Sequence, residues 1–216
     1  MTSFSYAIKT AILLFPIVAL LFTIPYIIYQ YHKYGAVSSY RSIIVYSFLL
    51  YLMVAYFLVI LPLPDIETVS MMKTPSYNLI PLHFISEIFS LSTFSVSDFA
   101  TYFPTLKNPV VYEAVFNVFL TVPFGVYLHY YFEFDFKKTL FYSFCLTLFF
   151  ELTQLSGLYF IYPRGYRVFD VDDLILNTLG GVIGYLLAFI PLKFLPTRKE
   201  IDESSLVKGQ KVSILR

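Results

Sequence analysis

Hydrophobic residues fill long stretches of this chain, and polar residues interrupt them at only a few positions. Five of these apolar runs reach the roughly 20 residues that a helix needs to cross a lipid bilayer. The runs cover about residues 7–31, 42–61, 112–131, 138–157 and 171–192. This pattern predicts an all-α fold, a polytopic transmembrane helical bundle with about five spans.

The first of these runs and the connection after the second need separate interpretations. The first run has no small-residue cleavage site after a short apolar core, so we expect a retained helix, bent by Pro16 and Pro25, rather than a signal peptide. The connection of about residues 62–111 contains apolar pieces, but each is too short to span a bilayer. We therefore expect a long outer loop that holds an interfacial or re-entrant segment.

The composition agrees with a membrane protein. Hydrophobic residues make up 58% of the 216 residues and charged residues only 13%, whereas a soluble domain carries about 25% charged residues. Cys145 is the only cysteine, so the chain can form neither an internal disulfide nor a thiolate metal cage. We expect the lipid bilayer as the main partner and no nucleic-acid partner, and the sequence leaves the oligomeric state open.

Basic residues collect in segments that an alternating path places on one side of the membrane. They lie in the first loop, between the third and fourth runs, and after the fifth run: His32, Lys33, Arg41, Lys137, Lys138, Lys193, Arg198, Lys199, Lys208, Lys211 and Arg216. The positive-inside rule puts these segments in the cytoplasm. It predicts a multi-pass protein of the cell membrane with its N-terminus outside and its C-terminus cytoplasmic. Arg164 and Arg167 oppose this arrangement, but they share a short loop with three aspartates.

The runs and loops divide the chain into three parts. Residues 1–41 hold the first transmembrane helix and a cytoplasmic loop, and residues 42–195 hold the main transmembrane domain. Residues 196–216 form a cytoplasmic tail. Because this tail mixes both charge signs and has few large apolar residues, we expect a solvated extension.

The most informative stretch is residues 167–184, RVFDVDDLILNTLGGVIG, which puts charged residues into a predicted span. Asp170, Asp173 and Asn177 share one face of a helix, and the glycines that follow continue this face toward the other end. An aspartate at the centre of a spanning helix costs roughly 2.5–3.5 kcal/mol on insertion scales. Polar groups on one face therefore indicate contact with protein or water, and they predict a functional site.

Polar residues in three runs lie at similar depths. At 1.5 Å per residue, Asn117 is roughly 8 Å from the outer start of the third helix, and Glu151 and Asn177 are about 10 Å from the outer ends of theirs. We expect them to meet in one shallow pocket that opens outward. Gln154 shares a face with Glu151 nearer the mouth, and Arg167 and Asp170 would cover the pocket from the short loop.

Each of these features also has a purely structural interpretation. Asp170 or Asp172 can cap a helix N-terminus, and the glycines can let helices approach closely. The two asparagines can be interhelical hydrogen-bond donors and acceptors. Arg167 can pair with Glu151 or Asp170 within the protein, because a lone buried carboxylate must find a cation or take up a proton.

Standard catalytic signatures do not occur in the sequence. It has no Gly-rich phosphate loop, no H-E-x-x-H motif and no serine flanked as a nucleophile elbow. Carboxylates could hold a hard divalent cation, but their spacing does not demand one. We therefore expect no cofactor and no metal.

These polar positions resemble the VanZ-like family of membrane proteins, known for teicoplanin resistance. The similarity covers about residues 49–190 and includes Asn78-Leu79-Ile80-Pro81, Asn117, Pro123-Phe124-Gly125, Glu151-x-x-Gln154 and Arg167-x-x-Asp170-x-Asp172-Asp173-x-x-x-Asn177-x-x-Gly180-x-x-x-Gly184. It implies a small bacterial helical membrane domain and, for its namesake, low-level resistance to a glycopeptide antibiotic. It implies no established reaction.

Three functions fit these observations. In the leading hypothesis, the site binds or modifies a cell-envelope molecule, a lipid-linked wall precursor or a lipoglycopeptide such as teicoplanin, and the ligand-binding residues are Arg167, Asn117, Gln154, Asn177 and Asn78. In the second, the protein is an intramembrane hydrolase or transferase with Glu151 as general acid or base, Asp170 or Asp173 as its partner, and Arg167 stabilising the developing negative charge. In the third, the cluster is a structural network. The sequence does not decide whether the protein is an enzyme.

Overall fold

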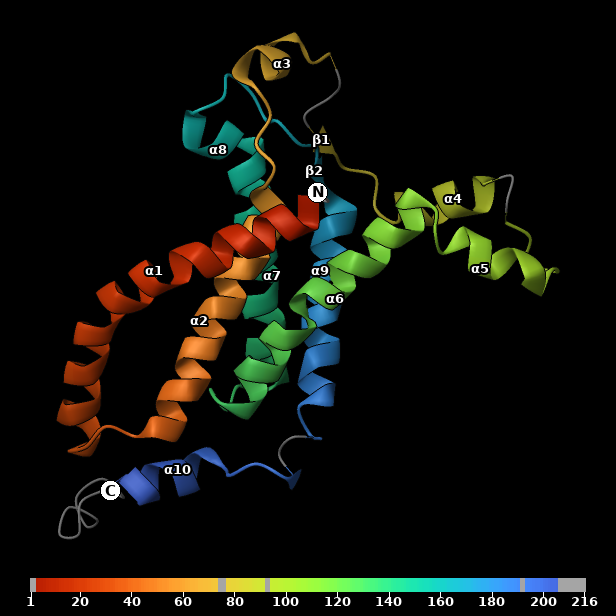
Figure 1. The fold of residues 1–216 in the computed structure, drawn as a ribbon. Helices are drawn as coiled ribbons and strands as arrows, with labels where there is room; N and C mark the ends of the chain where they lie inside the picture. The colour runs from red at the N-terminus through yellow and green to blue at the C-terminus, as the bar shows by residue number, and fades with distance from the viewer. Residues whose placement is uncertain (1–2, 74–76, 92–93, 191–192, 206–216) are drawn as a thin grey trace. The chain divides into compact units, whose positions relative to one another are not determined.

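The computed structural model describes residues 3–73, 77–91, 94–190 and 193–205. Nearly all regular structure in these residues is helical (Figure 1). The chain forms two compact units, Met1–Pro62 with Val126–Phe134 and Leu187–Arg216, and Leu63–Gly125 with Asp135–Leu186. The all-α prediction is therefore confirmed.

The first unit is built on a pair of long helices, α1 (Ser3–Tyr34) and α2 (Ser39–Ile60). Figure 1 shows α1 curving along its length, as expected from its internal prolines. Gly35 ends α1 with a φ of 73°, and the side chain of Ser38 caps α2. Because the linker is so short, the helices run antiparallel and pack through aromatic rings such as Tyr26 on Tyr46, with centroids 5.6 Å apart.

The tail contains a packed helix, α10 (Arg198–Ser205). A capping box begins it, because the Thr197 N–H donates to Glu200 Oε2 (2.7 Å) and the Glu200 N–H donates to Thr197 Oγ1 (3.3 Å). The Thr197 backbone and hydroxyl also hold the pKa of the Glu200 carboxyl below its usual value. Ile201 is only 3% exposed and joins a core with Ile44 and Tyr130.

Arg41 ties this helix to the start of α2. It is 2% exposed, and its guanidinium donates to Asp202 at 2.6 Å and to Gln30 Oε1 at 3.1 Å. The guanidinium also stacks 3.5 Å above the Tyr34 ring. The prediction of a solvated extension is therefore wrong for α10, because Ile201 and Asp202 contact other residues of the first unit.

The second unit contains the polar motif. In chain order its elements are α3 (Ile66–Met71), β1 (Tyr77–Asn78), α4 (His83–Ser90), η1 (Phe99–Thr101), α5 (Tyr102–Thr105), α6 (Pro109–Tyr130, to residue 125), α7 (Phe136–Leu155), α8 (Gly157–Phe160), β2 (Phe169–Asp170) and α9 (Val171–Leu187, to residue 186). Short helices thus fill the connection between the second and third runs, and its placement outside the membrane stays a prediction.

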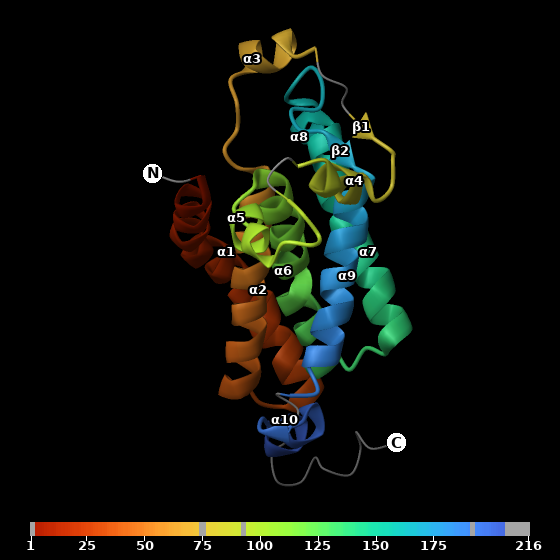
Figure 2. The same cartoon turned by 90° about the vertical axis from the view of Figure 1, so that its right-hand side faces the viewer.

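Glycines bring α9 close to both of its neighbours, and Figure 2 shows α9 between α6 and α7. A Cβ at Gly180 would collide with the Val118 carbonyl of α6, and one at Gly181 would collide with the Ser143 side chain of α7. On α6 itself, a Cβ at Gly125 would collide with the carbonyl of Gly181. The close-approach interpretation of the glycine face is confirmed, and this packing holds the polar end of α9 in place.

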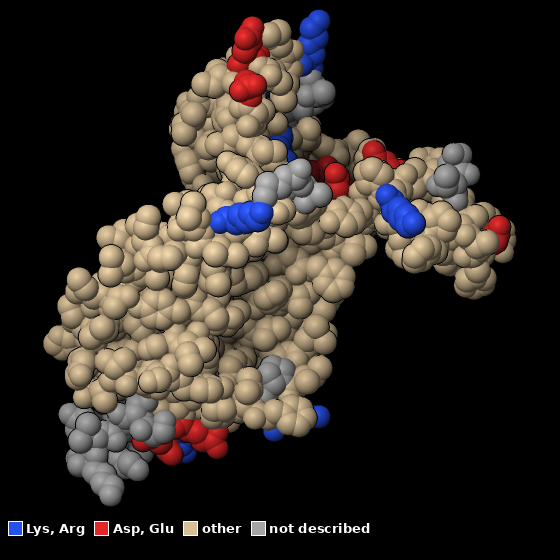
Figure 3. Space-filling view, viewed as in Figure 1, with Lys and Arg blue, Asp and Glu red and all other residues tan. Residues whose placement is uncertain are grey.

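Three helices of the described residues are long and apolar enough to cross a membrane: Phe4–Tyr34, Ser39–Ile60 and Pro109–Tyr130. Figure 3 shows that the surface over α1 and α2 carries few charged side chains. Helix α7, of 20 residues, contains a glutamate and two lysines, and α9 has only 17 residues. A membrane protein is confirmed, whereas the fourth and fifth spans stay predictions.

Candidate functional site

A short parallel pairing of β1 with β2 joins the long connection to the start of α9. It sets Tyr77 opposite Phe169 and Asn78 opposite Asp170. In this register the Asn78 side-chain N–H donates to Asp170 Oδ2 at 3.1 Å. The Asn-Leu-Ile-Pro element therefore lies against the acidic motif, although 92 residues separate the two side chains.

Asp170 is the N-cap of its own helix and a contact of α7. Its Oδ1 accepts the N–H of Asp172 at 2.8 Å, which satisfies one of the donors left free at a helix start. Its own N–H donates to Glu151 Oε2 at 3.0 Å. Glu151, which is 3% exposed, thus reaches the first turn of α9 from the end of α7.

Asp172 caps a different helix. Its two carboxylate oxygens accept the N–H groups of Leu82, at 2.5 Å, and Phe84, at 2.8 Å. Leu82 precedes α4 with a left-handed φ of 61° and has no side-chain cap of its own. Asp172 therefore replaces the missing N-cap of α4 from a distant part of the chain, and its charge also complements the helix dipole.

Asp173 is the point where α6, α7 and α9 meet. The Asn117 side-chain N–H of α6 donates to its carboxylate in a short hydrogen bond. Its carbonyl accepts the Asn177 side-chain N–H at 2.8 Å and the Thr147 hydroxyl of α7 at 3.4 Å. The predicted convergence of Asn117, Asn177 and the acidic residues is thus present in the structure.

Asn177 carries one unsatisfied atom. The side chain is 4% exposed, and its Oδ1 has no hydrogen-bond partner among the described residues. The Thr121 hydroxyl donates to the Asn177 carbonyl at 2.5 Å. A buried acceptor without a donor costs about 1–3 kcal/mol. The cluster is therefore not a fully satisfied structural network.

Arg167 and Gln154 lie at the edges of this cluster. Arg167 is exposed, and its positive charge acts on both Glu151 and Asp173. The negative charges of Asp170 and Asp173 act on Glu151 as well, so acidic groups outnumber this cation at the site. Gln154 is buried on α7, one turn beyond Glu151.

Thr121 and Thr147 are two site residues that the sequence analysis missed. Each is completely buried and donates to a backbone carbonyl of the first turns of α9. The available signal was their spacing, since Thr121 follows Asn117 by four residues and Thr147 precedes Glu151 by four. In an apolar run, a threonine by itself does not indicate a helix contact.

A metal site is not formed by the part of the chain that the structure describes, because it contains no group of three or more His, Cys, Asp or Glu residues that could hold an ion. The carboxylates instead accept hydrogen bonds from N–H groups. Asp170 and Asp172 each use both oxygens in this way. This arrangement can support hydrogen bonding and proton transfer.

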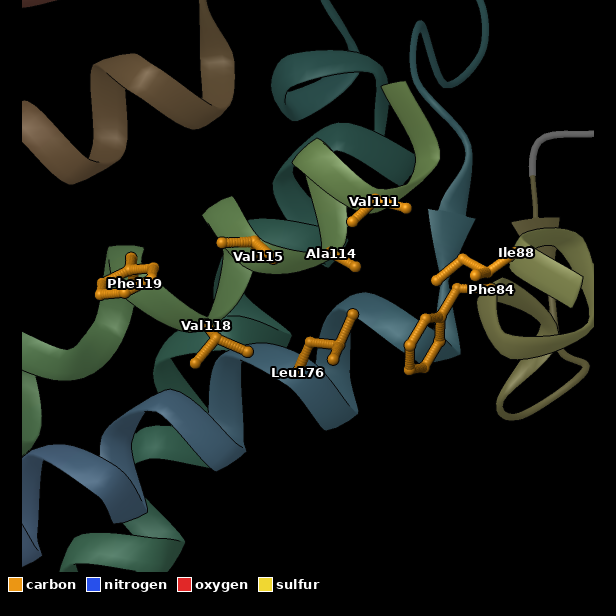
Figure 4. A pocket seen from close by; sticks show the side chains of 8 residues that line it. All are labelled: Phe84, Ile88, Val111, Ala114, Val115, Val118, Phe119 and Leu176. Carbon is orange, nitrogen blue, oxygen red and sulfur yellow. The ribbon is translucent and has the colours of Figure 1, made fainter. Parts of the chain in front are cut away.

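An apolar cavity of about 270 Å³ lies beside the cluster, and Figure 4 shows the side chains around it. It is lined by Phe84 and Ile88 of α4, Val111, Ala114, Val115, Val118 and Phe119 of α6, and Leu176 of α9. The sequence predicts a polar pocket, whereas this neighbouring cavity offers only hydrocarbon. Its walls are formed by α4, α6 and α9, and these three helices also make the hydrogen bonds of Asp172 and Asp173.

The comparisons with known proteins give one result. The family model described as VanZ/LLP1 matches residues 48–193, which contain every residue of the polar cluster. Neither the comparison with curated proteins nor that with solved structures gives a match. Since the matched segment is well over half of the chain, this membrane protein belongs to the VanZ/LLP1 family.

Proposed function

We propose that the start of α9 and the segments bound to it form an outward-facing site for a cell-envelope molecule. The molecule would be a lipid-linked wall precursor or a lipoglycopeptide such as teicoplanin. The observation that carries the proposal is the convergence of four polar side chains in one cluster, in which Glu151 and Asn177 are buried and Asn117 and Asp173 are half-buried. Buried polar groups in a membrane protein are costly, and they commonly mark functional sites.

The proposal includes an orientation. Helices α7 and α9 would be two further spans beside the three candidates, with the N-terminus outside and the C-terminus in the cytoplasm. The distribution of Lys and Arg supports this direction. The end of α7 and the start of α9 would then lie at the outer leaflet, where lipid-linked wall molecules present their polar parts.

The side chains suggest separate tasks in binding. Arg167 would attract a phosphate or carboxylate of the ligand. The unpaired Oδ1 of Asn177 would accept a hydrogen bond from a sugar hydroxyl or a peptide N–H. Asn78, Asn117 and Gln154 would hold the surrounding groups in position.

The test uses purified protein in nanodiscs with teicoplanin as the probe. Arg167→Ala should weaken binding while the amount of inserted protein stays the same. Lys107→Ala is the matched control, because Lys107 is an exposed cation of the same unit that contacts the Phe103 ring. Unchanged affinity of Arg167→Ala would contradict the proposal, and a loss of folded protein in its place would favour the structural interpretation.

A second candidate is an acid–base hydrolase or transferase, favoured by the electrostatic proximity of the buried Glu151 carboxylate to the half-buried Asp173 carboxylate. The charge of Asp173 acts directly on Glu151, and both groups lie near Asp170. Such carboxylate sets can divide the roles of acid and base. With a lipid-linked wall precursor as substrate, Glu151→Gln should abolish turnover and leave binding measurable, and full turnover in this variant would exclude the role.

A further inference from the structure

The cavity between α4, α6 and α9 is a second feature of the site that the proposed function does not explain. Its eight lining residues are all apolar. A water molecule needs two to four polar partners, which these side chains cannot supply. This lining suits a hydrocarbon better than it suits water.

The cavity opens at the surface of α6, a candidate membrane span. Its outer wall is formed by Val115 and Phe119, which are 43% and 68% exposed. Both belong to α6, one of the three candidate membrane spans. In a bilayer, the molecules that meet this surface at high concentration are the acyl chains of membrane lipids.

The cavity and the polar cluster share their structural elements. Leu176 of the cavity precedes Asn177 of the cluster, and Val118 follows Asn117. Phe84 connects the two, because its side chain lines the cavity and its N–H donates to Asp172, the residue before Asp173 of the cluster. Figure 4 shows Phe84 beside the first turns of α9 and Leu176 facing α6. A molecule with a polar head and an apolar chain could thus contact both at once.

From this continuity we infer that the cavity holds one acyl chain of a bilayer lipid, and that the ligand of the polar cluster is a lipid that enters sideways from the membrane. At about 270 Å³ the cavity lies below the roughly 300–1,000 Å³ of drug-sized sites. It therefore has room for part of one chain. The identity of the polar head rests on the proposed function, whereas the chain site does not.

Van der Waals packing, rather than the hydrophobic effect, would hold the acyl chain in the cavity. Bilayer hydrocarbon is as apolar as the cavity wall, so transfer from lipid to protein gains little from burial alone. The chain would gain contacts with Phe84, Leu176 and Ala114, and its head would be held by the cluster. Filling the cavity with a larger side chain should therefore displace the chain.

The experiment uses the full chain in phosphatidylglycerol vesicles that contain a lipid with a diazirine on one acyl chain. After illumination, mass spectrometry measures the labelling of residues 111–119 relative to Leu13 and Leu20 of α1, which are 76% and 71% exposed and report ordinary lipid contact. We expect labelling of residues 111–119 above this reference.

Leu176→Trp should remove the excess labelling, and Leu179→Trp is the control because Leu179 lies three residues away on α9 and is exposed. Ala114→Phe provides a second way to fill the cavity if the first variant is poorly inserted. Labelling at the reference level in the unchanged protein, or excess labelling that persists in both filled variants, would overturn the inference. Loss of teicoplanin affinity on Arg167→Ala concerns the head site alone, so the two proposals can fail separately.

Discussion

Replacing Asp172 tests whether one carboxylate stabilises α4 from the start of α9. Helix α4 has eight residues, none of them fully buried, and isolated helices shorter than about 12–15 residues are marginal in water. Asp172→Ala removes both acceptors from the N–H groups of Leu82 and Phe84. The helix would then retain only the partial packing of its apolar face.

The magnitude follows from these two hydrogen bonds. A bond to a charged group contributes about 1.5–3 kcal/mol, and loss of an N-cap costs about 0.5–2 kcal/mol. Water can replace part of the lost acceptor in so exposed a helix, so we expect α4 to lose about 2–3 kcal/mol of local stability. At 1.4 kcal/mol per factor of ten, the equilibrium constant for local opening of α4 rises roughly 30- to 150-fold.

Hydrogen exchange measured by mass spectrometry on the nanodisc protein reports this opening directly. The amides of α4 should exchange faster in Asp172→Ala, whereas α7 should keep its protection. Glu87→Ala is the control, because the Glu87 side chain is half-exposed. Among the described residues its ion pair is with His83 of the same helix, at 3.6 Å. Equal protection of α4 in Asp172→Ala and the unchanged protein would refute the capping role.

Two further predictions concern packing. Gly125→Ala should lower the free energy of unfolding by about 3 kcal/mol or more, because the added Cβ would meet backbone atoms that cannot move aside. Thermal unfolding measures this loss, and it should be smaller for the control Gly165→Ala, where the nearest atom to the added Cβ is 3.2 Å away. Asp202→Ala should cost about 3 kcal/mol by leaving buried Arg41 without its carboxylate. Limited proteolysis should then cut the tail faster, whereas the exposed Glu203→Ala should leave the cleavage rate unchanged.

Much of the helical architecture could be predicted because the bilayer imposes a length on apolar runs. The runs at 42–61 and 112–131 correspond to helices Ser39–Ile60 and Pro109–Tyr130. The predicted fifth run extends to residue 192, but α9 ends at Leu187, and residues 191–192 lie outside the described part of the chain. Hydrophobicity continues beyond a helix end, so it does not locate that end.

The helix α10 was missed for a different reason. Its sequence is mostly charged, and its one deeply buried apolar residue, Ile201, gives no periodic signal. A local signal did exist, since Thr197 and Glu200 have the spacing of a capping box. The contact of Asp202 with Arg41 spans 161 residues and could not be read from local sequence.

In the candidate site, helix rise placed Asn117, Glu151 and Asn177 at a common depth, and the structure joins them through Asp170 and Asp173. The depth of a residue along a helix follows from its number of residues from the helix end, so it can be calculated from the sequence. The apolar cavity depends instead on where α4 packs, and no periodicity reports the position of so short a helix.

The division of tasks among the three aspartates narrows the choice of reactive groups. Asp170 uses one oxygen to cap α9 and the other to hold Asn78, and Asp172 uses both oxygens to cap α4. Protonating or removing either would disturb a helix start. Asp173 takes no part in a cap, and its charge acts on buried Glu151 across the contact between α7 and α9. If the protein catalyses a reaction, Glu151 and Asp173 are therefore the pair that can change protonation state while the caps remain in place, and Asp170 has a positioning role.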